Sequence, residues 1–278
     1  MSRIRLNVFL GKVTLYLVNI ILSIGVIFPI FYALMISFMP QSDLFSSPPK
    51  IIPSALYFGN YPEVLNTVPI FRYILNSFLV SSIVTIILII ISSLSAYAFV
   101  YYDFKWKNTI FMLFLATMMI PGETVIIANY FLVARLHLLD TYLGLIIGGL
   151  PSVLGVFLMR QFFLSIPRDF YDAAQLDGCG KFNFLMKILL PLSRPAIGSL
   201  AIYSFLATWN QYMWPLLVTN SINMRTVQIG ISALQFSEAS NSYGLIMAGV
   251  VMVLAPSIII FVIGQRQLIE GLTGGLKG

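Results

Sequence analysis

Long stretches without charge limit how this chain can fold. Residues 13–42, 73–102 and 195–224 are each a run of 30 residues that contains no Asp, Glu, Lys or Arg. Residues 239–265 form another run of 27, and residues 141–159 a run of 19. About 20 apolar residues in a helix cross the hydrocarbon core of a bilayer. Each run is therefore long enough for one membrane span.

The composition and a sixth apolar segment complete this map. Of the 278 residues, 59% are hydrophobic and 9% are charged; soluble domains have about 45–50% and 25%, so an ordinary soluble domain is excluded. Residues 108–133 are apolar except for Glu123 and are interrupted by Pro121-Gly122, a break that neighbouring helices can satisfy. The sequence predicts one all-α, polytopic membrane domain over residues 1–278, with six transmembrane helices at about 15–38, 73–100, 108–133, 141–164, 196–219 and 243–264.

The Lys and Arg residues are unevenly divided between the two sides of the predicted membrane. With the N-terminus in the cytoplasm, twelve of the 16 fall in inner segments, and the outer segments hold Lys50, Arg72, Arg135 and Arg225. Cytoplasmic loops carry such an excess of positive residues, so we expect both termini to be cytoplasmic. The net charge of +6 then follows from topology and requires no nucleic-acid partner.

The predicted inner loop, residues 165–195, is patterned as two short helices. Pro167 suits the first turn of a helix, and Gly178 can end that helix in a left-handed conformation. Ala173 and Ala174 are small enough to allow close approach by a partner surface. A second amphipathic helix and the start of the next span follow, marked by Phe182, Leu185, Met186 and Leu189 and then by Pro191 and Pro195.

The spacing within this loop resembles a family signature. It reads Asp172-Ala173-Ala174, three residues, Gly178, nine residues, then Ile188-x-Leu190-Pro191. This resembles the EAA loop of ABC importer permeases, which usually has glutamate at the position of Asp172. Residues 159–167, 209–217 and 265–278 look like the carbohydrate-uptake branch, and most like the MalG-type permease of maltose-type systems. Residues 210–217 are also similar to the glycerol-3-phosphate permease subunit.

The resemblance implies a type I ABC importer (MetI-like) fold in the cytoplasmic (inner) membrane of a prokaryote. The implied partners are a second homologous permease, two cytoplasmic ATPase subunits, an extracytoplasmic solute-binding protein and membrane lipid. ATP and Mg²⁺ would be bound by the ATPases, because this non-catalytic chain has no Gly-x4-Gly-Lys-Ser/Thr loop and is expected to bind no cofactor. In maltose-type permeases the C-terminal tail reaches the ATPase, and residues 271–278 are expected to do so here. The implied ATPase-coupling residues are Asp172, Ala173, Ala174, Asp177, Gly178, Ile188, Leu190 and Pro191.

Charged and reactive residues beside the loop are open to two interpretations. Arg160 and Arg168 flank the loop, and either pair with a partner or are ordinary anchoring charges at the inner face of the membrane. Cys179 is the only cysteine, which excludes a disulfide framework and a Cys-based metal site. No metal site is therefore predicted.

A set of polar and aromatic residues inside the predicted spans is a candidate substrate pathway. Ionisable groups are costly within a membrane and by default indicate function, so Glu123 either lines the pathway or holds the broken helix by accepting backbone hydrogen bonds. Amides beside aromatic rings suit the hydroxyls and C–H faces of a sugar, although they also join helices by hydrogen bonds. The candidate pathway residues are Glu123, Asn129, Trp209, Asn210, Gln211, Tyr212 and Trp214.

Other classes of membrane protein fit the sequence less well. A proton-coupled secondary carrier would use Glu123 as its proton site, but such carriers usually have two-fold repeats and more than one intramembrane charge. An intramembrane protease needs a Ser/His pair, paired aspartates or a His-Glu-x-x-His motif, whereas the only histidine, His137, is expected on the surface of an outer turn. A channel needs a ring-forming charge or a filter-like loop. The solute stays open between glycerol-3-phosphate or its diesters and a mono- or oligosaccharide.

Overall fold

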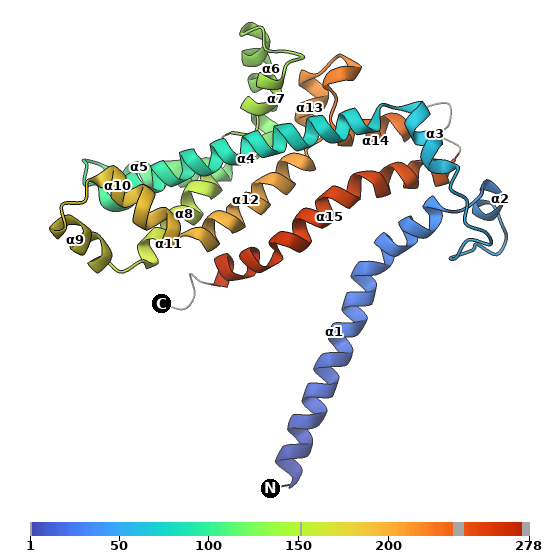
Figure 1. The fold of residues 1–278 in the computed structure, drawn as a ribbon, viewed down its shortest axis with the longest axis horizontal. Coiled ribbons are helices and arrows are strands. Elements are labelled where there is room, and N and C mark those ends of the chain that lie inside the picture. The colour runs from blue at the N-terminus through green and yellow to red at the C-terminus, as the bar shows by residue number, and fades with distance from the viewer. Residues whose placement is uncertain (1, 151, 236–241, 274–278) are drawn as a thin grey trace. The chain divides into compact units, whose positions relative to one another are not determined.

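A computed structural model describes residues 2–150, 152–235 and 242–273 (Figure 1). Within these ranges every regular element is a helix, which confirms the all-α prediction. The chain forms two compact units, Met1–Ile70 with Ile231–Leu254, and Phe71–Gly230 with Ala255–Gly278. The helices α14 (Val227–Gln235) and α15 (Tyr243–Thr273) contribute residues to both.

The first unit is built on α1 (Ser2–Ser37), α2 (Gln41–Leu44) and α3 (Asn60–Thr67). Asn60 joins α3 to the end of α1, because its Nδ2 donates to the backbone oxygens of Ser37 at 2.9 Å and Met39 at 3.1 Å. A Cβ atom at Gly244 of α15 would collide with the Asn60 side chain. The absence of a side chain at this glycine therefore lets α15 approach α3 closely.

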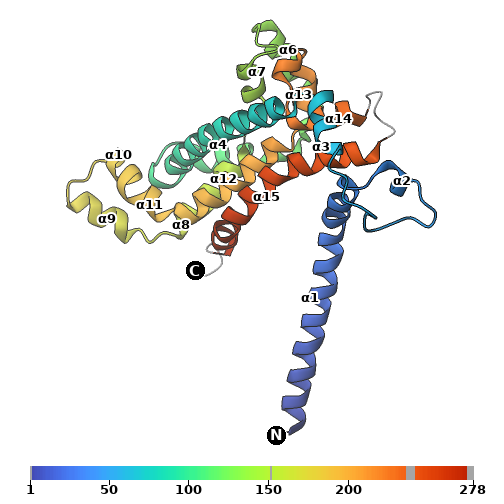
Figure 2. The same ribbon diagram turned by 45° about the vertical axis from the view of Figure 1, so that its right-hand side comes forward.

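The second unit contains α4 and the helices that surround it. Figures 1 and 2 show α8 and α12 beside α4, with α9 to α11 at one end of these helices and α6, α7 and α13 grouped away from that end. The elements are α4 (Ile70–Tyr101), α5 (Lys107–Ala116), η1 (Thr117–Met119), α6 (Gly122–Arg135), α7 (Tyr142–Ile147), α8 (Val153–Ser165), α9 (Asp169–Leu176), α10 (Lys181–Phe184), the π-helical turn η2 (Leu185–Leu189), α11 (Leu190–Leu192), α12 (Arg194–Trp209), α13 (Met213–Val218) and η3 (Ile222–Met224).

In the described ranges, three helices are long and apolar enough to cross a membrane: Gly11–Ser37, Ile70–Tyr101 and Tyr243–Ile269. Two bent pairs raise the number to five if each pair is one span. Helices α5 and η1 meet α6 at 98°, and α10 to α11 meet α12 at 77°.

The other predicted spans differ from single straight helices. The break between η1 and α6 contains Pro121, where the sequence predicts an interruption. The predicted span 141–164 is divided between α7 and the 13 residues of α8. The predicted span 196–219 is interrupted between α12 and α13, at residues whose side chains are polar or aromatic. The count of six spans stays a prediction.

Candidate functional site

The loop that resembles the EAA signature contains a well-defined helix end. Helix α9 ends at Leu176, and Gly178 follows with φ +73°, a left-handed conformation that strongly favours glycine. The Gly178 N–H donates to the oxygen of Gln175 at 3.0 Å, and the Cys179 N–H donates to that of Ala174 at 2.8 Å. The predicted helix and its glycine end are confirmed.

An aromatic cluster seats α9 and α10 on the end of α4. The Tyr171 ring of α9 lies 5.0 Å from that of Phe184 and 5.1 Å from that of Tyr101. Tyr101 and Phe184 are 5.3 Å apart, and the Tyr97 hydroxyl donates to the backbone oxygen of Lys181 at 2.9 Å. These contacts join the loop to α4 through packed rings.

The predicted ATPase-coupling residues fall into two groups. Asp172, Ala173, Asp177, Gly178 and Pro191 are exposed, whereas Ile188 and Leu190 are partly buried and pack on the core beneath the loop. Ala174 is only 4% exposed and lies in that core. Only Ala173 of the two alanines therefore offers a surface for close approach, contrary to the expectation for Ala174.

The second helix of the loop also differs from its predicted face. Leu185 and Leu189 are buried as expected, but Phe182 is 68% exposed and Met186 is 49% exposed, and Phe184 is buried in their place. The chain forms a π-helical turn from Leu185 to Leu189. Its hydrogen bonds run from i to i+5, so residues five apart, such as Phe184 and Leu189, share a face.

Five of the seven candidate pathway residues, from distant segments, line one cavity of about 520 Å³. It is lined by Glu123 and Asn129 of α6 and by Gln211, Tyr212 and Trp214. Glu123 is exposed, and its carboxylate accepts no hydrogen bond from the described residues. Among the described residues, the backbone hydrogen bonds by which Glu123 would hold the broken helix are therefore not observed, and its pathway role stays a prediction.

Two of the predicted pathway residues do not line this cavity. Trp209 is 1% exposed and stacks on Phe205 at 5.8 Å. Asn210 donates through Nδ2 to the Leu206 oxygen at 2.9 Å, and its Oδ1 accepts from Gln228 Nε2 at 3.3 Å. Trp209 is thus a packing residue, and Asn210 ends α12.

Sequence reasoning missed a second cavity of about 220 Å³ beside the first. Gln211 and Gly148 line both cavities, and Tyr203, Ser204 and Thr208 of α12 line the second one. These residues belong to α12, which is an apolar helix. Its sequence pattern does not distinguish residues that line a cavity from residues that contact another helix.

Long-range hydrogen bonds hold the segment that carries Trp214. Trp214 Nε1 donates to the oxygen of Gly144 at 3.1 Å. Beyond α13, the carboxylate of Asp140 accepts from the N–H groups of Ser221 and Asn220, both at 2.9 Å. The hydrogen bond from Ser221, and then that from Asn220, lower the pKa of Asp140. His137 in the same turn is exposed, as predicted.

Comparisons with known proteins agree with this fold. The pattern of the family "binding-protein-dependent transport system inner membrane component" matches residues 88–271. A chain in the crystal structure of a bacterial ABC transporter involved in the import of the acidic polysaccharide alginate superposes with a TM-score of 0.82 and 22% identity, covering 93% of this chain and 96% of that one. That likeness shows a shared type I ABC importer permease fold.

Two relatives are similar over almost their whole length. The arabinooligosaccharides transport system permease protein AraQ of Bacillus subtilis is 38% identical, covering 96% of each chain. The sn-glycerol-3-phosphate transport system permease protein UgpE of Agrobacterium fabrum is 35% identical, covering 95% of this chain and 96% of the relative. This chain belongs to the family of inner membrane components of binding-protein-dependent transport systems.

Proposed function

We propose that this chain is a permease subunit of an ATP-driven importer that takes up a neutral carbohydrate delivered by a solute-binding protein. It shares its pathway with a second permease, and both of its termini are cytoplasmic. Two ATPase subunits bind ATP and Mg²⁺, and one of them docks on the exposed residues of the 172–178 segment. Family membership supports the transport role, and the exposure of that segment supports the docking.

The residues that line the 520 Å³ cavity favour a neutral solute. Among the described residues it has one carboxylate, Glu123, two amides, Asn129 and Gln211, two aromatic rings and no cation. A phosphate needs positive partners and would be repelled by Glu123. Sugar hydroxyls can both donate to and accept from these groups, and ring faces can pack on sugar C–H groups. Of the two solutes named for the relatives, the lining favours a saccharide over glycerol-3-phosphate.

The packing of the loop on the neighbouring helices supports the proposed coupling of ATP hydrolysis to this cavity. The loop core contains Ala174, Phe184 and Leu189 and continues into α4, α8 and α12. Helix α12 leads directly to Gln211. Closure of the ATPases would therefore displace the loop and α12 together, a rigid-element movement of the kind used in allosteric switching.

Replacement of Gly178 tests the docking role. Gly178→Asp is expected to abolish uptake and to uncouple ATP hydrolysis from transport, because an Asp side chain is strained at φ +73° and adds charge to the docking surface. The permease should still insert in the membrane. Uptake and ATPase activity are measured in proteoliposomes that hold the whole transporter and its binding protein.

Gly180→Asp is the matched control. Gly180 is also exposed with open space around its Cβ position, but its φ of −66° suits any residue and it precedes α10, where Asp is a favoured cap. Gly180→Asp should retain more transport than Gly178→Asp. Normal solute accumulation by Gly178→Asp would contradict the docking role.

One further assay distinguishes an ATP-driven importer from a proton-coupled carrier, and another distinguishes a saccharide from glycerol-3-phosphate as the solute. Vesicles with a proton gradient but without ATP should not accumulate solute, and accumulation there would favour a proton-coupled carrier that uses Glu123. In the proteoliposomes with ATP, an arabino-oligosaccharide should be taken up and glycerol-3-phosphate should not. Uptake of glycerol-3-phosphate alone would overturn the neutral-sugar assignment.

A further inference from the structure

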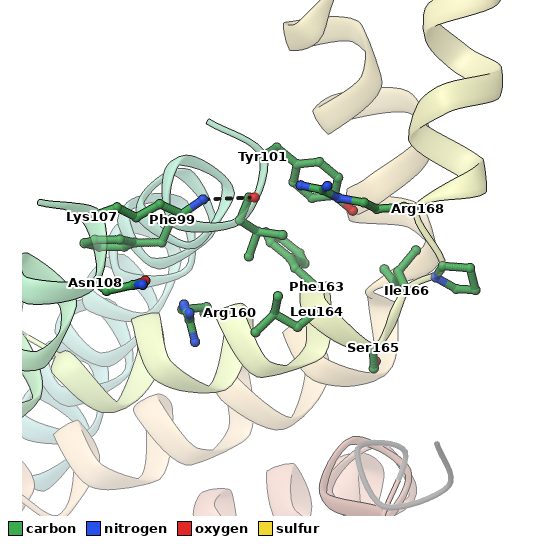
Figure 3. A pocket seen from close by; sticks show the side chains of 12 residues that line it. Phe99, Tyr101, Lys107, Asn108, Arg160, Phe163, Leu164, Ser165, Ile166 and Arg168 are labelled. Atoms are coloured by element: carbon green, nitrogen blue, oxygen red, sulfur yellow. Dashed lines mark hydrogen bonds between the residues drawn. The ribbon is translucent and has the colours of Figure 1, made fainter. Parts of the chain in front are cut away.

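A basic cavity lies between the end of α4, the start of α5 and the end of α8 (Figure 3). It has a volume of about 460 Å³, and its polar lining includes Lys107, Asn108, Arg160 and Arg168. No carboxylate is among the described residues that line it. Three cations around a cavity without an acid create a positive potential that attracts an anion.

Arg160 has an unused hydrogen-bond donor at this cavity. Its guanidinium lies over the ring of Phe111, 4.1 Å from guanidinium carbon to ring centroid, and Figure 3 shows it beside Asn108 within the cavity. Its Nε is buried and has no hydrogen-bond partner among the described residues. A buried donor is costly when unpaired, and the charge of this guanidinium faces a cavity that has no carboxylate among its described lining residues.

The other two cations are incompletely neutralised. Lys107 Nζ donates to the Tyr102 oxygen at 2.9 Å and lies 3.5 Å from the carboxylate of Asp103. The side chain of Asp103 is 98% exposed, so solvent screens this pair. Arg168 lies beside Tyr101 (Figure 3) and makes no ion pair within the described residues.

The surroundings of the cavity are those of a membrane surface. It lies where the predicted spans 73–100, 108–133 and 141–164 meet the cytoplasm. The nearby Trp106 is 64% exposed, and Lys105 Nζ lies 5.8 Å from its ring centroid. Exposed Trp and Lys side chains are typical of the interface between lipid and water.

We propose that this cavity binds the phosphate group of an anionic phospholipid from the cytoplasmic leaflet. The phosphate oxygens would accept hydrogen bonds from Arg160, Arg168 and Lys107, and the acyl chains would leave past Leu164, which is 50% exposed. This inference rests on the orientation in the proposed function. Since residues 165–168 lead directly into α9, the bound lipid would hold the start of the coupling loop at the membrane surface.

Native mass spectrometry of the purified transporter complex tests this proposal. With phosphatidylglycerol and phosphatidylcholine offered in equal amounts, phosphatidylglycerol should be retained preferentially. Arg160→Gln and Arg168→Gln should each lower its retention about fivefold, the effect of removing one cation near a lipid phosphate. Arg135→Gln removes an exposed arginine on the predicted outer side and should leave retention unchanged.

The outcomes that overturn the proposal are distinct. Equal retention of phosphatidylglycerol by wild type, Arg160→Gln and Arg168→Gln would refute the site. If Arg160→Gln does not assemble, Arg168→Gln alone decides, because Arg168 is exposed and its replacement should not disturb assembly. Displacement of the lipid by inorganic phosphate would show a site for free phosphate instead. Gly178→Asp should lose uptake while retaining phosphatidylglycerol. A wild-type complex that retains the lipid but fails to transport refutes the proposed function and leaves the lipid site standing.

Discussion

At the scale of residues, Ala173 and Ala174 show how neighbours in one helix come to have different roles. Successive residues of an α-helix point about 100° apart, so α9 turns Ala174 into the core with Phe184 and leaves Ala173 exposed. The sequence pattern contains both alanines and does not distinguish them, because the face that is buried depends on where α4 and α10 pack.

Enlarging each alanine should separate packing from docking. Ala174→Leu is expected to lower the free energy of unfolding by about 1–3 kcal/mol through overpacking, whereas Ala173→Leu should change it by less than about 0.5 kcal/mol. Ala173→Leu should instead weaken ATPase binding to the exposed face. Thermal unfolding of the purified permease and co-purification of the ATPase measure the two effects. Equal thermal stability of the two variants would contradict the assigned burial.

At the scale of elements, a single carboxylate ties the turn after α6 to the segment after α13. Asp140 accepts from the N–H groups of Ser221 and Asn220, and its own N–H donates to Val218 at 2.7 Å. These partners are far from Asp140 in sequence, so no local pattern predicts the connection. Without it, the segment that carries Trp214 would lose one of its long-range supports.

This connection should depend on pH. The hydrogen bonds lower the pKa of Asp140 from its ordinary value of 3.8, so the carboxylate stabilises the fold above that value, and the contribution is lost as pH falls through the lowered pKa. The melting temperature of wild type should exceed that of Asp140→Asn at about pH 5 and approach it at about pH 3.

Asp103→Asn is the control for that comparison, because the Asp103 side chain is 98% exposed. Its melting temperature should follow that of wild type at both pH values. A difference between wild type and Asp140→Asn that stays constant with pH would rule out a role for the ionised carboxylate.

At the scale of the whole molecule, the apolar surface of α1 requires a covering. Gly11–Ser37 is long and apolar enough to cross a membrane. A helix that is hydrophobic all round is stable only in lipid or against another protein. Contact of α1 with lipid and contact of α1 with another protein both agree with the proposed function, in which a second permease lies beside this chain in the membrane.

The orientation of the chain can be tested by thiol labelling. In a Cys179→Ala background, His137→Cys should react with a membrane-impermeant maleimide in intact cells, because His137 is exposed in a predicted outer turn. Lys105→Cys, exposed in a predicted inner turn, should react only after the membrane is permeabilised. The opposite pattern would reverse the proposed topology.

Local sequence patterns were sufficient for the membrane setting and for the main features of the coupling loop. Apolar length sets which segments can enter lipid, and the break at Pro121 and the end of α9 at Gly178 follow from the backbone conformations of those two residues. The predicted tail contact, residues 271–278, includes residues beyond the described range, which ends at residue 273. The π-helical turn had no such local signal, because it depends on how Phe184 and Leu189 pack.

Only the tertiary structure decided which distant residues share a cavity. Glu123 joins Gln211 in one cavity, and Lys107 joins Arg160 in another, because α6 packs on α13 and α5 packs on α8. In an almost uniformly apolar chain, hydrophobic periodicity marks no buried face, since both lipid and protein cover apolar side chains. The sequence by itself therefore determined the membrane environment and the local turns, while side-chain packing between helices determined the sites.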